Sequence, residues 1–89
     1  MTIDHFTNDC LGVDVSYYQT SIDWHKFHEG GVRFAIIRAS QGNYLQDTRF
    51  HTHLEGAQQA GLICGAYHYF ELNCSVSSQI NTLKAALGN

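Results

Sequence analysis

The chain has 89 residues, which suits one small domain or part of a larger one. Its hydrophobic share of 44% is ordinary for a soluble globular protein, and no apolar run approaches the roughly 18 residues of a transmembrane helix. The net charge of −3, with only five lysines and arginines, argues against a surface that binds nucleic-acid phosphates.

The first ten residues are polar and are interpreted as a flexible lead-in. They lack the charged and then apolar segments of a signal peptide, so we expect a protein that stays cytoplasmic until some other route releases it. Three cysteines, Cys10, Cys64 and Cys74, show no C-x-x-C spacing. Free thiols are therefore expected rather than a disulfide scaffold.

The first predicted strand, residues 11–16, carries a carboxylate at its centre. Its apolar members alternate with Asp14 and two small residues, so Asp14 faces the opposite side from Leu11, Val13 and Val15. A carboxylate there is costly to bury unless it is paired or used. Asp14 is either an active-site group at the end of a strand or a cap of the next turn through backbone contacts.

The next elements follow after a polar, aromatic loop. Asp23 can cap a short helix that starts near Trp24 and is stopped by Gly30 and Gly31. The near-continuous apolar run over residues 33–39 predicts a parallel strand that is covered by helices.

The second half of the chain continues the alternation of strands and helices. A helix is expected from Asp47 or Thr48 to Ala60, a strand over 62–70 and a helix over 75–87. The order βαβαβα predicts an α/β fold with parallel strands and right-handed crossovers. Three such units cannot close a barrel, so the sheet would have two open edges through which copies could self-associate.

The expected core combines the apolar stripes of the helices with the strand interiors. It comprises Trp24, Phe27, Ile36, Ile37, Phe50, Leu54, Ile63, Ile80 and Leu83.

Histidines and cysteines raise the alternative of a metal site. His25 and His28 fall on one predicted helix, and His51 and His53 on the next. Neither pair has a common zinc-ligand spacing, and His51 and His53 would point to opposite sides of a helix. Surface histidines are the better interpretation, and no metal or organic cofactor is expected.

Several separated motifs resemble one known family. They are Gly12-Val13-Asp14-Val15-Ser16, Tyr17-Tyr18-Gln19, Ile22-Asp23-Trp24, the run from Gly31 to Ser40, Ala57-x-x-Ala60-Gly61-Leu62, Gly65-Ala66-Tyr67-His68-Tyr69-Phe70 and Gln79. Together they cover about residues 11–87 and resemble glycoside hydrolase family 25, the Chalaropsis-type lysozymes of bacteria, fungi and phage endolysins.

The resemblance implies an irregular TIM-like (β/α) barrel, of which residues 11–89 would form the N-terminal βαβαβα part. It also implies cleavage of the β-1,4 bond between N-acetylmuramic acid and N-acetylglucosamine in peptidoglycan, in the cell wall outside the cell. By the resemblance Asp14 corresponds to the active-site aspartate of the first strand, and Tyr67 and His68 lie beside the sugar. Tyr17 and Tyr18 either stack on sugar rings or only fill their loop.

Two further positions are expected to contact substrate. Arg38 either binds an anionic group, such as the lactyl carboxylate of muramic acid, or pairs with Asp14; the pair is favoured, because a buried carboxylate needs a partner. Gln41 stands where the family usually has Glu, and its amide can still form hydrogen bonds.

The second catalytic group of the family is expected beyond this sequence. The family's Asp-x-Glu pair, whose Glu is the general acid, lies on a fourth strand after the last predicted helix. Glu71 is the only other acidic residue near the ends of the strands, and a solvent-exposed loop glutamate is its better interpretation. We therefore expect the 89-residue chain to be inactive by itself.

Two other functional classes remain as alternatives. The chain could be a non-catalytic remnant that binds cell-wall sugars through Tyr17, Tyr18, Tyr67 and Tyr69. It could also be a generic flavodoxin-like interaction domain, but the loop after residue 39 lacks the glycine spacing and lysine of a phosphate loop.

Overall fold

The computed structural model describes the backbone of residues 2–7 and 10–88, and the side chains of residues 11–88. In chain order the elements are β1 Thr2–Thr7, β2 Cys10–Val15, α1 Trp24–Glu29, β3 Val32–Gln41, β4 Leu45–Gln46, α2 Phe50–Gln59, β5 Ile63–Tyr69 and α3 Val76–Leu87. The three expected helices and three expected strands are all present, with boundaries that shift by a few residues.

The sheet is mixed rather than parallel throughout. Strands β2 and β5 flank β3 and run parallel to it, as the βαβαβα pattern predicts. However, β1 pairs antiparallel with β2, and β4 pairs antiparallel with β3. The prediction of parallel strands alone is therefore wrong at these two strands.

Both antiparallel strands use backbone groups that the parallel strands leave unpaired. Residues 2–7, within the expected lead-in, form β1 and cover the outer edge of β2. Strand β3 is extended to Gln41, where Gly42 with a φ of 55° turns the chain back so that Leu45 pairs with Gln41. An open strand edge offers N–H and C=O groups to any nearby segment, which apolar periodicity does not reveal.

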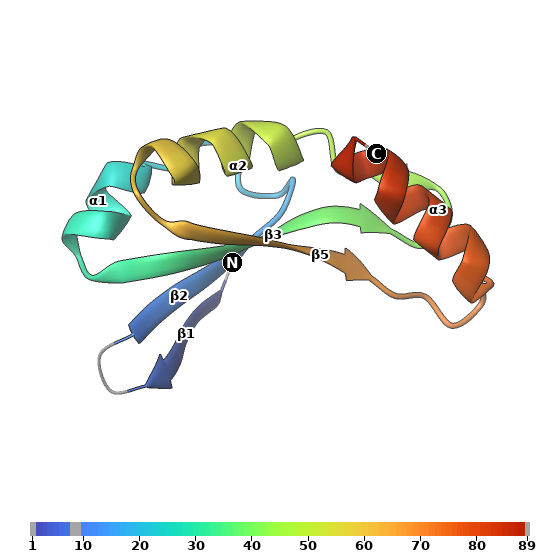
Figure 1. Cartoon of the computed structure of the whole chain (residues 1–89), viewed down its shortest axis with the longest axis horizontal. Coiled ribbons are helices and arrows are strands. Elements are labelled where there is room, and N and C mark those ends of the chain that lie inside the picture. The colour runs from blue at the N-terminus through green and yellow to red at the C-terminus, as the bar shows by residue number, and fades with distance from the viewer. Residues whose placement is uncertain (1, 8–9, 89) are drawn as a thin grey trace.

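All three helices lie over one face of the sheet, and the opposite face carries no described element (Figure 1). The buried core lies between these layers. From the strands it takes Val13, Val15, Ala35, Ile37 and Ala39, and from the helices it takes Trp24, Phe50, Ala57 and Ala86. We call the uncovered side the open face. No helix in the described part of the chain is long and apolar enough to cross a membrane.

The expected core is partly confirmed. Trp24, Ile37 and Phe50 are buried, while Phe27, Leu54 and Leu83 are half-buried and pack against the core. The prediction is wrong for three isoleucines: Ile63 is 76% exposed, Ile80 is 46% exposed, and Ile36 is half-buried on the open face, outside the core. Ile63 pairs in register with Phe34, so it faces the side of the sheet that no described helix covers.

Register places Asp14 on the open face. Along β2, β3 and β5 the neighbouring residues Asp14, Ile36 and Gly65 stand side by side, and so do Gly12 and Phe34. The ring of Phe34 lies over Gly12, where an added Cβ would come within 1.8 Å of two ring carbons. Glycine is thus required at position 12 for Phe34 to cover β2 beside Asp14.

Candidate active site

The open face forms a cleft around Asp14. The cleft has a volume of about 360 Å³ and is lined by Asp14, Ile36, Tyr67 and Tyr69. Burial raises the pKa of Tyr67, the negative charge of Asp14 raises it further, and the positive charge of Arg38 opposes these effects. Tyr67 therefore keeps its proton at neutral pH and offers a hydrogen-bond donor beside a carboxylate.

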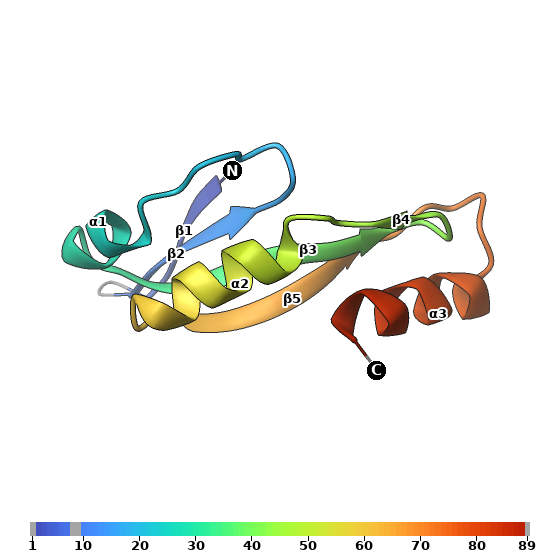
Figure 2. The ribbon, with the colours of Figure 1, turned by 90° about the horizontal axis from the view of Figure 1, so that it is seen from above.

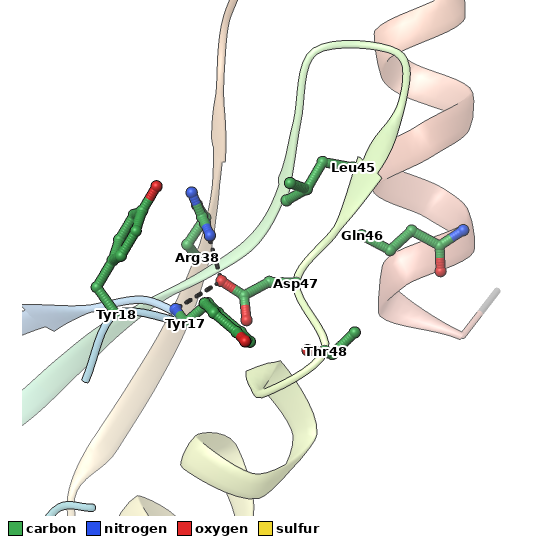
Figure 3. Close-up of a pocket in the computed structure, with 7 residues that line it drawn as sticks. All are labelled: Tyr17, Tyr18, Arg38, Leu45, Gln46, Asp47 and Thr48. Carbon is green, nitrogen blue, oxygen red and sulfur yellow. Dashed lines mark hydrogen bonds and ion pairs between the residues drawn. The ribbon is translucent and has the colours of Figure 1, made fainter. Parts of the chain in front are cut away.

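A second cleft lies where the β2–α1 loop meets the β4–α2 turn (Figure 3). Its volume is about 420 Å³, and it is lined by Tyr17, Tyr18, Arg38, Leu45, Gln46, Asp47 and Thr48. Two of the expected sugar-contacting tyrosines thus stand at the same cleft as Arg38. We call it the tyrosine cleft.

Asp47 connects the segments around the tyrosine cleft through buried hydrogen bonds. Its side chain is completely buried, and Oδ2 accepts hydrogen bonds from Arg38 Nε at 2.8 Å and from the backbone N–H of Tyr17 at 2.9 Å. Oδ1 accepts from the backbone N–H of Arg49 at 2.9 Å. The ion pair of Arg38 is therefore with Asp47, which corrects the expectation that Arg38 pairs with Asp14.

Two arginines pack against the rings of Tyr17 and Tyr18. The guanidinium of Arg49 lies 4.1 Å from the ring centroid of Tyr17, and it also donates a hydrogen bond to the Tyr17 carbonyl. The guanidinium of Arg38 lies 5.6 Å from the ring of Tyr18. Tyr18 is nevertheless 77% exposed, so one of its ring faces remains open to a ligand.

A chain of hydrogen bonds continues from Arg38 to Glu71. Arg38 Nη1 donates to Gln41 Oε1 at 2.9 Å, and Gln41 Nε2 donates to Glu71 Oε2 at 2.8 Å. The hydroxyl of Tyr44 donates to the same carboxylate oxygen. These bonds to Tyr44 and then Gln41 lower the pKa of Glu71. Glu71 is therefore ionised at neutral pH, whereas a general acid needs a raised pKa.

Replacing Tyr44 by Phe is expected to raise the pKa of Glu71 toward the value of an ordinary glutamate. The hydrogen bond from Tyr44 is the largest cause of the lowering, and phenylalanine cannot donate it. Because the pKa of Glu71 is lowered in the folded state, its contribution to stability is present above the unfolded pKa and is lost as the pH falls through the folded pKa. As the pH falls from the unfolded pKa of Glu71 through its folded pKa, the Tyr44→Phe variant should therefore lose less stability than the parent protein.

The measurement is an NMR pH titration of the Glu71 side chain. Tyr18→Phe is the control, since Tyr18 has no hydrogen bond to Glu71 among the described side chains. An unchanged Glu71 titration in Tyr44→Phe would contradict the assignment.

His68 faces the helices instead of the Asp14 cleft. Its Nδ1 lies 2.7 Å from Ser40 Oγ, and its Nε2 lies 2.8 Å from Gln79 Oε1. The amide nitrogen of Gln79 donates to the carbonyls of Glu71 and Cys74, so its oxygen must accept from His68. In its neutral form His68 thus donates a hydrogen bond from Nε2 to Gln79 and accepts one at Nδ1 from the Ser40 hydroxyl. These hydrogen bonds connect β5 to β3 and α3, and a sugar contact of His68 stays a prediction.

The remaining histidines and thiols whose side chains the structure describes lie apart from one another. Among the described residues no three His, Cys, Asp or Glu side chains gather closely enough to hold a metal ion. His53 is buried against Trp24 and bonds to the Ser16 carbonyl at 3.1 Å, so its expected surface position is wrong. Cys64 and Cys74 are free thiols, and the side chain of Cys10 lies outside the described residues.

The structure brings together some of the predicted site residues and adds one that was missed. Asp14 and Tyr67 share the open-face cleft, while Tyr17, Tyr18 and Arg38 share the tyrosine cleft, with Gln41 bonded to Arg38. The missed residue is Asp47. A signal for it existed, because an arginine within a buried strand requires a carboxylate partner, and the loop after that strand supplies one.

Comparisons with known proteins match most of this chain. The sequence profile described as "Glycosyl hydrolases family 25" matches residues 13–84. Lysozyme M1 of Streptomyces globisporus is 41% identical over 69 residues, which cover 78% of this chain and 24% of that protein. An N,O-diacetylmuramidase of Arthroderma benhamiae is 31% identical over 77 residues, which cover 86% of this chain and 33% of that protein.

Solved structures show the same similarity. The muramidase from Trichobolus zukalii is 39% identical with a TM-score of 0.78, and the match covers 83% of this chain and 36% of that one. A family 25 glycosyl hydrolase from Bacillus anthracis is 29% identical with a TM-score of 0.79, and the match covers 91% of this chain and 38% of that one. The chain thus spans between about a quarter and two fifths of these relatives.

Proposed function

This chain belongs to family 25 of the glycosyl hydrolases, and from that premise we propose that it carries one catalytic carboxylate, Asp14, of a peptidoglycan-cleaving site. The proposed reaction is hydrolysis of the β-1,4 bond between N-acetylmuramic acid and N-acetylglucosamine in the cell wall, outside the cell. The observation that supports it is the position of Asp14, near the C-terminal end of β2 in a cleft beside Tyr67. Active sites of barrel enzymes occupy that end of the strands.

The proposed chemistry needs a second acidic group. Glycoside hydrolysis uses one carboxylic acid to protonate the leaving oxygen and another carboxylate to stabilise or attack the cation that develops at the sugar. Asp14 suits the second role, and Tyr67 can donate a hydrogen bond nearby. Glu71 does not suit the first, because its pKa is lowered. We infer that the general acid comes from the part of an irregular TIM-like barrel that this chain does not span.

The tyrosine cleft is the proposed binding surface for neighbouring sugars. Tyr17 and Tyr18 offer aromatic faces whose orientation is fixed by Arg49 and Arg38, and Gln41 adds polar contacts at its rim. Sugars present apolar C–H faces and a ring of hydroxyl groups, which suit aromatic rings and amides respectively. His68 supports this region only indirectly, through its bonds to Ser40 and Gln79.

The test compares the 89-residue chain with an extended chimera. The chimera appends the residues of Streptomyces globisporus lysozyme M1 that follow the matched region, and intact lysozyme M1 is the positive control. We expect the chimera to clear a suspension of Gram-positive cell walls, and the short chain to leave its turbidity unchanged. Clearance by the short chain would show that the second acidic group lies within these 89 residues.

The same samples test the non-catalytic alternative. Walls are pelleted, and the protein that stays in solution is measured for both forms. If the chimera binds walls but never clears them while lysozyme M1 does, the sugar-binding alternative replaces the enzymatic proposal.

A further inference from the structure

The carboxylate of Glu71 has no part in the proposed reaction, yet its backbone is held in a defined place. The backbone N–H of Glu71 donates to Gln79 Oε1 at 3.0 Å, and its carbonyl accepts from Gln79 Nε2 at 2.9 Å. Gln79 lies on α3 and is only 2% exposed. Both polar groups of the Glu71 backbone are thus bonded to one buried side chain, which sets the direction in which the carboxylate leaves its loop.

The turn between β3 and β4 is built around this carboxylate. Figure 2 shows the turn beside the loop that leads from β5 to α3, and the N–H of Gly42 donates to the Tyr69 carbonyl at 3.0 Å. A Cβ added at Gly42 would come within 3.2 Å of Glu71 Cδ and within 2.6 Å of the Tyr44 ring. Glycine at position 42 therefore lets the carboxylate and the Tyr44 hydroxyl meet under the turn.

The side-chain amide of Gln41 has only one orientation that satisfies its neighbours. Its Oε1 accepts from Arg38 Nη1 at 2.9 Å, and its Nε2 donates to Glu71 Oε2 at 2.8 Å. A guanidinium offers only donors and an ionised carboxylate only acceptors, so turning the amide over would break both bonds. The negative charge of Glu71 and the positive charge of Arg38 are therefore coupled through this one amide.

The bond to Gln41 completes the positioning of the Arg38 guanidinium. Arg38 Nε donates to Asp47 and Nη1 donates to Gln41, and two bonds in different directions fix the plane of the group. One bond alone would leave the guanidinium free to turn about it. In its fixed position it lies 5.6 Å from the Tyr18 ring and lines the tyrosine cleft with it (Figure 3).

We propose that Glu71 is a positioning residue of the tyrosine cleft, which acts through Gln41 on Arg38. The carboxylate orients the amide of Gln41, and the amide holds the guanidinium beside the Tyr18 ring. The proposal rests on the sugar-binding role proposed above for this cleft. Because Asp14 lies in the other cleft, the effect of Glu71 belongs to substrate binding and not to the bond-breaking step.

The experiment exchanges the two side chains. Gln41→Glu sets two carboxylates against each other, and Glu71→Ala removes the acceptor for the Gln41 amide. The double variant Gln41→Glu with Glu71→Gln restores the order of donors and acceptors. The carboxylate introduced at position 41 then accepts both from Arg38 and from the amide introduced at position 71.

The first measurement is the NMR signal of the Arg38 Nε–H in the 89-residue chain. The signal should move in both single variants and return to its parent position in the double variant. In the extended chimera, KM for soluble peptidoglycan fragments should rise at least about threefold in each single variant and stay within about twofold of the parent value in the double, with kcat unchanged. The same exchange in the exposed Glu55–Gln59 pair of α2, which is joined by a 3.4 Å bond, should change neither readout.

Three results would overturn the proposal. The first is an Arg38 signal that stays in place in both single variants. The second is a double variant whose KM is as high as that of Gln41→Glu alone. The third is a fall in kcat with KM unchanged, which would move Glu71 to the chemical step. If the chimera never clears walls while lysozyme M1 does, only the enzymatic proposal fails; the fraction of the 89-residue chain that pellets with walls then replaces KM.

Discussion

Asp14→Asn in the extended chimera is expected to reduce the rate of cell-wall clearance by at least about 100-fold. Asparagine has nearly the same shape as aspartate, so the cleft around Ile36 and Tyr67 should keep its form. The amide carries no negative charge, however, and it can neither stabilise nor attack the cation that develops at the sugar. The loss should appear in kcat, with wall binding retained.

Asp23→Asn is the matched control for this experiment. Asp23 caps α1 by accepting a hydrogen bond from the Lys26 backbone, and asparagine serves equally well at that position. The control removes the same charge without touching either cleft, so its clearance rate should equal that of the parent chimera. If Asp14→Asn kept more than a tenth of the parent rate, Asp14 would not be the catalytic carboxylate.

Asp47→Ala should give the largest loss of stability, about 3–5 kcal/mol in the free energy of unfolding. Alanine leaves the Arg38 guanidinium buried without its ion-pair partner, and it removes the acceptor for the backbone N–H groups of Tyr17 and Arg49. A charge left uncompensated in the interior is far more costly than the loss of a surface ion pair. Urea unfolding of the short chain, monitored by circular dichroism, measures the change.

The design allows for a variant that does not fold. A loss of this size is a large share of the roughly 5–15 kcal/mol of a typical domain, so Asp47→Asn is measured in parallel and should lose less. Glu55→Ala is the control, because Glu55 is exposed and accepts only a 3.4 Å hydrogen bond from Gln59. It should change stability by at most about 0.5 kcal/mol. Equal effects of Asp47→Ala and Glu55→Ala would refute the structural role of Asp47.

The sequence alone predicted the elements that depend on local pattern. The continuous apolar run at 33–39 became the central strand β3, and the four- and three-residue spacing of Phe50, Leu54 and Ala57 became the inner face of α2. Asp14 was placed on the opposite side of its strand from Val13 and Val15, and it lies there. Period-two and period-3.6 patterns suffice for such features, because each depends on one element facing one core.

The predictions that failed depend on contacts between segments that lie far apart in the sequence. The partner of Arg38 was expected to be Asp14, but the turn after β4 brings Asp47 closer. Ile63 and Ile80 are apolar and were expected in the core, yet no described segment covers them. Tyr67 and His68 were both expected beside the sugar, but neighbouring residues of a strand point to opposite faces, so Tyr67 lines the open-face cleft and His68 lines a cavity on the helix side. Their sugar contacts stay predictions.

The coverage of one sheet face by three consecutive helices has a consequence for how the protein is made. Helices α1 and α2 pack beside strands that lie close to them in the sequence, β3 for α1 and β3 and β5 for α2, so these units can complete their contacts soon after they leave the ribosome. Helix α3 instead packs mainly against the earlier strands β3 and β4. The buried layer is thus expected to form progressively during translation. Helix α3 can complete its part of the buried layer only after β3 and β4, the earlier strands that it packs against, are in place.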